Sequence, residues 1–139
     1  MMRHTTIRWM ALGAASLMLV SGCSGGQSNP AKVAEKFLHA MAEKDSETVC
    51  EVALIDDKPM TTKEDRQACA ALLTPIFDQE AAAELARYAH AKVERAEVDG
   101  DTATVPSDAI TGVLGVDEDV HLQRIDGKWY VAEGLSSDI

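Results

Sequence analysis

Aromatic side chains are scarce in this chain of 139 residues: they make up only 4% of it, as two Trp, two Tyr and two Phe. Hydrophobic residues nevertheless reach 46%, so a buried core is possible, and the composition argues against wholesale disorder. The core must therefore be mainly aliphatic, built from Ala, Val and Leu. The length is that of one ordinary domain.

Basic residues are also in short supply, with 13 Lys and Arg against 23 Asp and Glu. Residues 1–22 contain two arginines and no acid, so the remainder has 11 basic and 23 acidic residues and a formal charge of −12. Such a domain repels phosphate backbones, which argues against nucleic acid as a partner. It is also repelled by an anionic lipid surface, so charge cannot hold it there. The acidity is typical of solubility, with a basic partner as the alternative.

No apolar run is long enough to cross a bilayer as a permanent helix, which takes about 20 residues. The longest run, residues 9–20, has twelve residues and follows a segment that carries Arg3 and Arg8 and no acid. This order is typical of a secretory signal peptide. The absence of an Arg-Arg pair favours the general secretion route over the twin-arginine route.

The apolar run ends in Val20-Ser21-Gly22-Cys23, which resembles the lipobox of bacterial lipoproteins. Small side chains before the cysteine let the backbone lie extended in a peptidase cleft, and the Cys23 thiol is the nucleophile that accepts a diacylglyceryl group. The resemblance implies a signal peptide over 1–22, lipidated Cys23, and a flexible spacer to residue 29. The domain is then held by lipid at the extracytoplasmic face of the cell membrane. An ordinary secretory signal with a chance cysteine is the alternative.

Three cysteines are an odd number for an exported protein. If Cys23 carries lipid, Cys50 and Cys69 remain and can pair in an oxidising compartment. Their spacing fits no Cys-x-x-Cys redox motif, and they are too few for a structural zinc site. Two buried free thiols are the alternative to a disulfide.

Apolar residues at helical spacing predict four helices in the first half of the domain. The first runs over 30–44 behind Asn29 as N-cap, and a second short one follows Asp45 and carries Cys50. Residues 55–59 are predicted to be a loop. A third helix is expected to begin at Thr61 with a capping box to Glu64, and Pro75 to kink or end it. The inner face of this third helix is expected to carry four residues: Cys69, Leu72, Leu73 and Ile76. Asp78 is expected to cap a fourth helix that ends near Ala89.

The pattern changes to hairpins after His90. Residues 92–98 and 101–105 are predicted to be strands joined by Asp99-Gly100, and 120–125 and 128–132 strands joined by Asp126-Gly127. Asp-Gly turns tolerate positive φ, as tight hairpins require. Residues 107–119 are ambiguous, although Gly112 and Gly115 indicate a bend or bulge.

Helices followed by hairpins predict an α+β fold, with N-terminal helices packed on a curved antiparallel sheet. The stretches 31–45 and 120–131 resemble the opening helix and the last hairpin of nuclear transport factor two-like domains, also called cystatin-like or ketosteroid-isomerase-like. In that superfamily the last hairpin reads as an apolar strand, a Gly turn, then Trp and an aliphatic residue. Small lipoproteins of this type, with a cysteine pair in the helical part, occur among actinobacteria. The resemblance implies one cone-shaped domain over 30–139. An unrelated α+β sandwich is the alternative.

Cone-shaped domains of this kind often enclose a pocket between helices and sheet. Five large side chains are candidates for lining it: Phe37, Met41, Phe77, Tyr88 and Trp129. At their helical and strand spacing, plain core packing is the alternative. Enzymes of the superfamily combine an acidic base with a tyrosine in this pocket. Tyr88 or Tyr130 can supply the phenol, but no carboxylate lies on a clearly inward face beside them, so no catalytic residue is assigned.

Motifs for cofactors and metals are missing too. The sequence has no Gly-rich phosphate loop, no Gly-x-Ser-x-Gly and no Cys-His nucleophile pattern. The histidines lack metal-binding spacing, and Asp117-Glu118-Asp119 lacks the spaced ligands of a calcium loop. We therefore expect no metal and no cofactor. The sequence favours a non-catalytic module that binds a protein or a small apolar ligand, with a hydrolase or isomerase on the same fold as the alternative.

Overall fold

The computed structural model describes residues 27–79 and 82–133. Its first helix, α1, spans Pro30–Glu43 and begins where the sequence predicts. The side chain of Asn29 accepts a hydrogen bond from the Ala31 amide at 3.0 Å, and Pro30 occupies the first helical position, where no amide partner is needed. Lys44 ends the helix in a left-handed conformation with φ of 55°.

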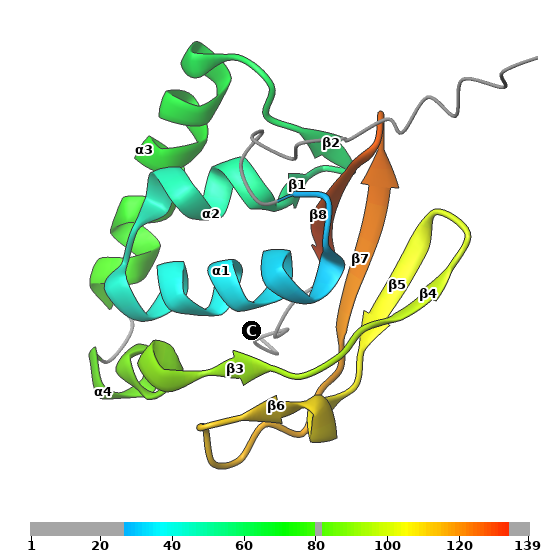
Figure 1. Cartoon of the computed structure of the whole chain (residues 1–139). Helices are drawn as coiled ribbons and strands as arrows, with labels where there is room; N and C mark the ends of the chain where they lie inside the picture. Colours follow the sequence, from blue (N-terminus) through cyan, green and yellow to red (C-terminus); the bar gives the residue numbers. More distant parts are fainter. Residues whose placement is uncertain (1–26, 80–81, 134–139) are drawn as a thin grey trace, which may run out of the picture.

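α1 lies across one face of the sheet, with further helical segments on both of its sides (Figure 1). The side of α1 that faces the sheet carries its buried residues: Val33, Ala34, Phe37, Leu38 and Ala40. The spacing of three and four residues places these side chains on one stripe of the helix. The α+β architecture is therefore confirmed, with antiparallel sheets that do not close into a barrel.

α2 spans Ser46–Val52 behind its N-cap Asp45, and α3 spans Lys63–Gln79. The two helices are joined by a disulfide between Cys50 and Cys69, whose Cα atoms lie 6.0 Å apart. The predicted pair is therefore present in the structure. Both sulfurs are buried, because Cys50 and Cys69 are 0% and 5% exposed.

The predicted start and inner face of α3 are wrong in detail. Thr62, not Thr61, caps the helix through its hydroxyl, which accepts the Asp65 amide at 3.1 Å. Leu72 and Ile76 are 73% and 49% exposed, although the sequence placed them inside. Cys69 is buried as predicted and Leu73 is half-buried against the core, whereas Phe77 is a buried residue that the sequence did not place inside. Because α3 packs mainly on α2 rather than on the sheet, only a narrow stripe of it is covered.

The end of α3 also differs from expectation. The helix continues through Pro75 to Gln79, so Pro75 does not end it and Asp78 lies inside it instead of capping a new helix. The next helix, α4, spans Ala82–Ala86 and leads into a single 3-10 turn, η1, at Arg87–His90. The fourth predicted helix is therefore two short pieces.

The main sheet has four antiparallel strands in the order β4-β5-β7-β8. They span Glu97–Asp99, Thr102–Val105, Val120–Ile125 and Lys128–Glu133. The last turn is the predicted Asp126-Gly127, with φ of 51° and 77°, as a tight hairpin requires. The first turn is shifted by one residue, because Asp99 pairs with Thr102 and leaves Gly100 and Asp101 as the turn.

The predicted strand over residues 92–98 is split. Its first part, β3 at Lys92–Val93, leaves the main sheet and pairs with β6 at Ile110–Thr111. β6 follows a 3-10 turn, η2, at Ser107–Ala109. Gly112 then provides the bend that the sequence indicates: its φ is 79°, and a side chain there would collide with the His90 carbonyl.

The predicted loop over 55–59 contains a small hairpin. Its strands are β1 at Leu54–Ile55 and β2 at Lys58–Pro59. Asp56 and Asp57 form the turn, both with positive φ, which Asp tolerates better than most residues. The hairpin lies next to β8, where Ala53 forms an isolated bridge with Val131.

The core between α1 and the sheet supports a first prediction. Leu38 on α1 is 0% exposed, whereas Leu72 on α3 is 73% exposed. We expect Leu38→Ala to lower the free energy of unfolding by about 2–5 kcal/mol, because it removes buried methyl groups and leaves a cavity. Leu72→Ala is the matched control and should change it by less than about 0.5 kcal/mol. Urea unfolding measures both, and equal losses would show that the helix faces are assigned wrongly.

Candidate functional site

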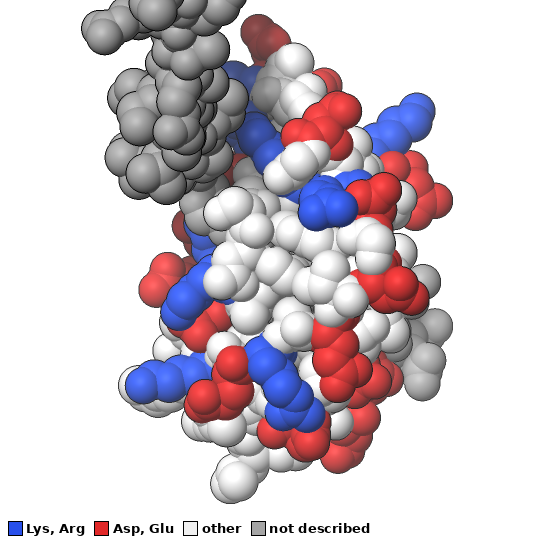
Figure 2. Space-filling view, turned by 45° about the vertical axis from the view of Figure 1, so that its right-hand side comes forward, with Lys and Arg blue, Asp and Glu red and all other residues white. Residues whose placement is uncertain are grey.

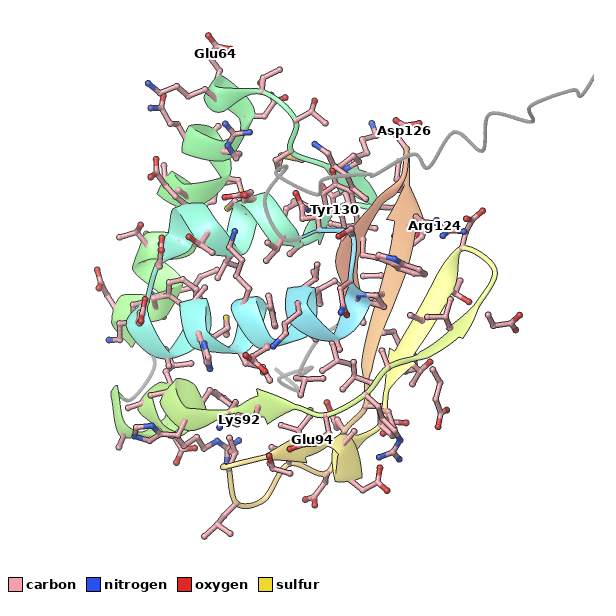
Figure 3. The ribbon with its side chains drawn as sticks, viewed as in Figure 1. Glu64, Lys92, Glu94, Arg124, Asp126 and Tyr130 are labelled. Atoms are coloured by element: carbon pink, nitrogen blue, oxygen red, sulfur yellow. A yellow bond between two sulfur atoms is a disulfide. The ribbon has the colours of Figure 1, made fainter. Side chains whose placement is uncertain are left out.

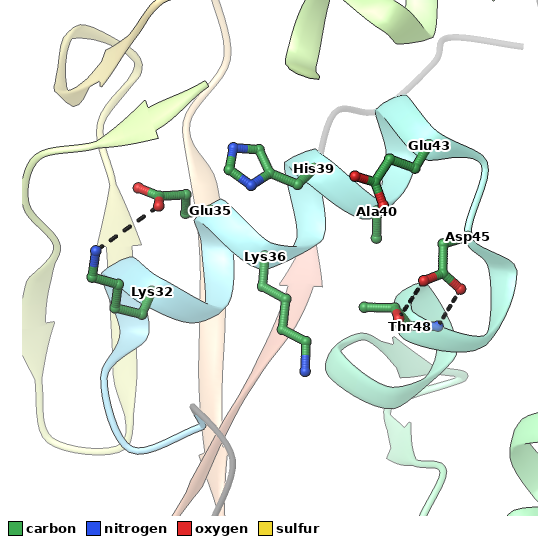
Figure 4. A pocket seen from close by; sticks show the side chains of 8 residues that line it. All are labelled: Lys32, Glu35, Lys36, His39, Ala40, Glu43, Asp45 and Thr48. Carbon is green, nitrogen blue, oxygen red and sulfur yellow. Dashed lines mark hydrogen bonds and ion pairs between the residues drawn. The ribbon is translucent and has the colours of Figure 1, made fainter. Parts of the chain in front are cut away.

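Among the hollows in the described part of the chain, we consider two that are each large enough to hold a small molecule. The first, which we call the helix groove, has a volume of about 330 Å³ and runs along the outer side of α1 (Figure 4). Its lining is largely charged and consists of Lys32, Glu35, Lys36, His39, Ala40, Glu43, Asp45 and Thr48.

Most polar groups of the helix groove already have structural partners. Glu35 accepts the Val93 amide at 3.0 Å, and the His39 Nε2–H donates to the Ala91 carbonyl at 2.7 Å. These two bonds attach α1 to β3 and to the residue before it. Glu35 also lies 3.9 Å from the Lys32 ammonium. The groove therefore serves packing between elements more than ligand binding.

Asp45 in the same groove is a helix cap. Its carboxylate accepts hydrogen bonds from the Thr48 hydroxyl at 2.6 Å and from the Thr48 amide at 3.1 Å. The hydroxyl bond is the main cause that lowers the pKa of Asp45 below its ordinary 3.8, with the amide bond next and burial opposing both. The charged form is thus favoured in the folded state.

A second prediction follows for the pH dependence of stability. Because the folded pKa of Asp45 is lowered, its stabilising contribution is present above pH 3.8 and is lost as the pH falls through the folded value. Asp45→Asn keeps an oxygen acceptor for the Thr48 amide but cannot ionise. Asn caps a helix about as well as Asp, so only the charge is lost: we expect the wild type to be more stable than Asp45→Asn by about 0.3–1 kcal/mol at pH 7, and the difference to vanish toward pH 2. Urea unfolding along a pH series tests this, and a pH-independent difference would contradict it.

The second hollow, which we call the polar hollow, is the candidate functional site. It has a volume of about 270 Å³ and lies where five separate segments of the chain meet. Its lining residues are Gln27, Glu51, Met60, Thr61, Arg66, Lys128 and Tyr130. They come from the first described residue, from α2, from the loop before α3, from the first turn of α3 and from β8.

Gln27 closes one side of the polar hollow and is the only buried polar or charged side chain among the described residues. Its carbonyl accepts the Trp129 amide at 2.8 Å, and its side-chain amide donates to the Trp129 carbonyl at 3.2 Å. The same amide donates to the Glu51 carbonyl at 3.4 Å. Gln27 therefore fills the free edge of β8 and fixes where the chain enters the domain.

Local structure also sets the donors of the polar hollow. The Thr62 cap starts α3 and brings Arg66 to its first turn, where the guanidinium donates to the Thr61 carbonyl at 3.3 Å. Lys128 and Tyr130 are two residues apart on β8, so both point to the same face of the strand. Figure 3 shows Tyr130 on β8 and Asp126 at the turn that precedes this strand.

The Tyr130 hydroxyl remains protonated at neutral pH. Burial is the main cause that raises the pKa of Tyr130 above its ordinary 10.0, and the charges of Asp126 and Glu51 raise it further. Within the described part of the chain neither this hydroxyl nor the Lys128 ammonium has a hydrogen bond or an ion pair. Glu51, in contrast, lies 3.3 Å from the Lys36 ammonium. The polar hollow thus presents unused donors beside a carboxylate that already has a cation.

The five residues predicted to line a pocket lie elsewhere. Four of them are buried in the hydrophobic core, and Met41 packs against its margin: Phe37, Phe77, Tyr88 and Trp129 are 8%, 4%, 5% and 3% exposed. The Tyr88 hydroxyl accepts a bond from Arg87 at 2.7 Å, and the Arg124 guanidinium lies 5.2 Å from the Trp129 ring centre. Both hollows are lined by other residues, apart from Tyr130, which the sequence named as a possible phenol. Cys23 lies outside the described residues.

Metal binding finds no support in the described residues, where no group of three His, Cys, Asp or Glu side chains is placed to hold an ion. In the acidic stretch 117–119, Asp119 accepts the Ser107 amide at 2.8 Å and so orders the loop before β7. No helix within residues 27–79 and 82–133 has the length and apolar character needed to cross a bilayer.

The chemistry available in the polar hollow is recognition of a small polar group. Residues with three kinds of donor line it, a guanidinium, an ammonium and a phenol, together with one carboxylate. The sequence missed this site because its residues are far apart in the chain. The spacing of Lys128 and Tyr130 is the only local signal that places two of them together. No protein-family model, no curated protein and no solved structure matches the chain.

Proposed function

We propose that this protein is a membrane-tethered, extracytoplasmic lipoprotein whose folded domain is a non-catalytic binding module. The observation that carries the proposal is Val20-Ser21-Gly22-Cys23 at the end of a short apolar run behind two arginines. The disulfide between Cys50 and Cys69 supports it, because such bonds persist in oxidising compartments outside the cytoplasm. Each of the three cysteines then has an assigned role, Cys23 as lipid acceptor and the other two in the disulfide.

The finer fold assignment, a nuclear transport factor two-like or cystatin-like cone, is part of the proposal. It is supported by α1 packed against one face of an antiparallel sheet and by a last hairpin that places Trp129 in the core. The pairing of β3 with β6 outside the four-stranded sheet sets this chain apart from a simple cone.

The exposure and pairing of the Asp and Glu side chains favour binding over catalysis. No Asp or Glu is buried among the described residues. The polar hollow does contain a carboxylate and a tyrosine, Glu51 and Tyr130, which is the arrangement that a hydrolase or isomerase would need. The Glu51 side chain, however, is 42% exposed, and its carboxylate is already paired with the Lys36 ammonium at 3.3 Å. A hydrolase or isomerase activity is therefore the second candidate function.

The residues that line the polar hollow indicate which kind of ligand it can bind. A small apolar ligand would need space among the aromatic residues, but these are packed in the core. The polar hollow instead suits a polar ligand. A protein partner that contacts the same surface is compatible with the tethered position.

Intact mass spectrometry of the protein extracted from membranes tests the proposal. We expect a mass that lacks residues 1–22, carries a diacylglyceryl group on Cys23, with or without a further acyl chain, and rises by two hydrogens on reduction. A soluble protein without lipid, or one that retains residues 1–22, would overturn it.

A further inference from the structure

The polar hollow lies close to the point where the chain would be anchored. Gln27 lines this hollow, and Cys23 precedes it by four residues. An extended chain covers at most about 3.5 Å per residue, so the two residues are separated by no more than about 14 Å. The polar layer of a bilayer is about 5–8 Å thick on each side. A lipid on Cys23 would therefore hold the hollow beside the headgroups of the surrounding lipids.

The donors of the polar hollow suit a phosphate. Arg66 has five N–H groups, and one bond, to the Thr61 carbonyl, is used within the protein. The Lys128 ammonium and the Tyr130 hydroxyl have no partner among the described residues. Guanidinium and ammonium groups are the usual ligands of phosphate oxygens, and a protonated phenol adds a neutral donor.

The charges around the hollow are consistent with one bound anion. Glu51 is paired with Lys36 at 3.3 Å, and Asp126 acts on Tyr130 from the hairpin turn. Arg66 and Lys128 add two positive charges, so the cations at this site outnumber the acids by one. The face shown in Figure 2 carries many scattered acidic side chains and no broad basic area. The net charge of −12 over residues 23–139 also argues against general attraction to an anionic membrane, so the donors of the hollow are suited to one phosphate group and not to an anionic surface as a whole.

We infer that the polar hollow binds the phosphate group of a membrane phospholipid headgroup through Arg66, Lys128 and Tyr130. This inference rests on the proposed lipid anchor, which brings the hollow to the headgroups. Binding would orient the tethered domain on the membrane, so that the end with the β7–β8 turn and the start of α3 faces the bilayer. Free phosphate offers the same oxygens and is the alternative source of the ligand.

The test uses the full chain extracted from membranes in a non-ionic detergent. Glycerol 1-phosphate and inorganic phosphate are titrated separately by calorimetry, and native mass spectrometry looks for a phospholipid that stays bound. We expect glycerol 1-phosphate to bind more tightly than inorganic phosphate and one phospholipid to remain on the protein. Arg66→Gln should weaken glycerol 1-phosphate binding by about tenfold or more, because a charge-assisted bond is lost.

Two further variants separate recognition from folding and from general charge. Tyr130→Phe keeps the ring and removes only the hydroxyl, and should weaken binding several-fold with an unchanged circular dichroism spectrum. Arg95→Gln is the matched control for charge. Arg95 is exposed, does not line the hollow, and forms an ion pair with Asp108 at 3.1 Å. This variant should bind like the wild type.

Each other outcome counts against the inference. Equal affinity for both probes with no retained phospholipid would make the hollow a free-phosphate site. No binding of glycerol 1-phosphate, or an equal loss in Arg95→Gln, would overturn the site itself. The intact mass of the same sample separates the two proposals: lipid on Cys23 without binding refutes the site alone, whereas binding without lipid on Cys23 refutes the anchor and with it the headgroup as the source.

Discussion

Replacing both disulfide cysteines, as Cys50→Ala/Cys69→Ala, is expected to lower the free energy of unfolding by about 3 kcal/mol. The bond closes a loop with a sequence separation of 19 residues, and opening such a loop restores about that much conformational entropy to the unfolded chain. The free energy of unfolding of a single domain is about 5–15 kcal/mol, so the variant should unfold at a clearly lower urea concentration. Urea unfolding of oxidised wild type, reduced wild type and the double variant measures the effect.

The loss of local stability in the double variant should be greatest in α3. This helix is attached to the rest of the protein through the two buried residues Cys69 and Phe77, and it packs mainly on α2. Without the bond only Phe77 remains as a buried anchor. Hydrogen exchange should therefore accelerate in α3 more than in β7 and β8, which are paired with each other and covered by α1. Equal acceleration in all three elements would show that the bond stabilises the domain as a whole and does not act as a local anchor.

Local signals in the sequence predicted the elements that depend on local chemistry. Asn29 and Pro30 fixed the start of α1, because a side-chain acceptor and a missing amide both suit the first turn. Asp126-Gly127 fixed the last turn, because both residues tolerate positive φ. The cysteine pair was predictable from the number of cysteines once one was assigned to lipid.

Contacts between distant segments were beyond this reasoning. The strand over 92–98 alternates as a hairpin arm should, yet Lys92 and Val93 pair with residues 110–111. On α3, Leu72 and Ile76 share helical spacing with Cys69, but the buried stripe runs through Cys69 and Phe77 and leaves Leu72 and Ile76 exposed. Periodicity shows which residues share a face. It does not show which face another element covers.

The polar hollow illustrates the same limit. Arg66 is positioned by the cap of α3, Tyr130 by the turn before β8, and Gln27 by the open edge of β8. Each of these local features can be recognised in the sequence. Whether the residues come together, however, depends on how α2 and β8 pack against each other. The five large side chains expected to line a pocket lie in the hydrophobic core or against it, and they line neither the helix groove nor the polar hollow.

The lipid anchor gives the prediction with the largest effect on location. In Cys23→Ser the thiol that accepts the diacylglyceryl group is replaced by a much weaker nucleophile, so lipid transfer and the cleavage before residue 23 should both fail. The protein should then keep residues 1–22 and lack the acyl mass, and it should no longer depend on acyl chains, each methylene of which contributes about 0.8 kcal/mol to membrane binding. Intact mass spectrometry of membrane and soluble fractions measures both changes.

Ser24→Ala is the control, because residue 24 follows the acceptor and takes no part in the transfer; this variant should be lipidated like the wild type. Reduction of Cys23→Ser should still add two hydrogens, because Cys50 and Cys69 are already joined to each other. A free thiol or a mixed disulfide in this variant would mean that Cys23 belongs to the disulfide chemistry of the chain. Retained lipid, or cleavage at the same bond, would show that the anchor lies elsewhere, and the orientation of the polar hollow toward headgroups would lose its basis.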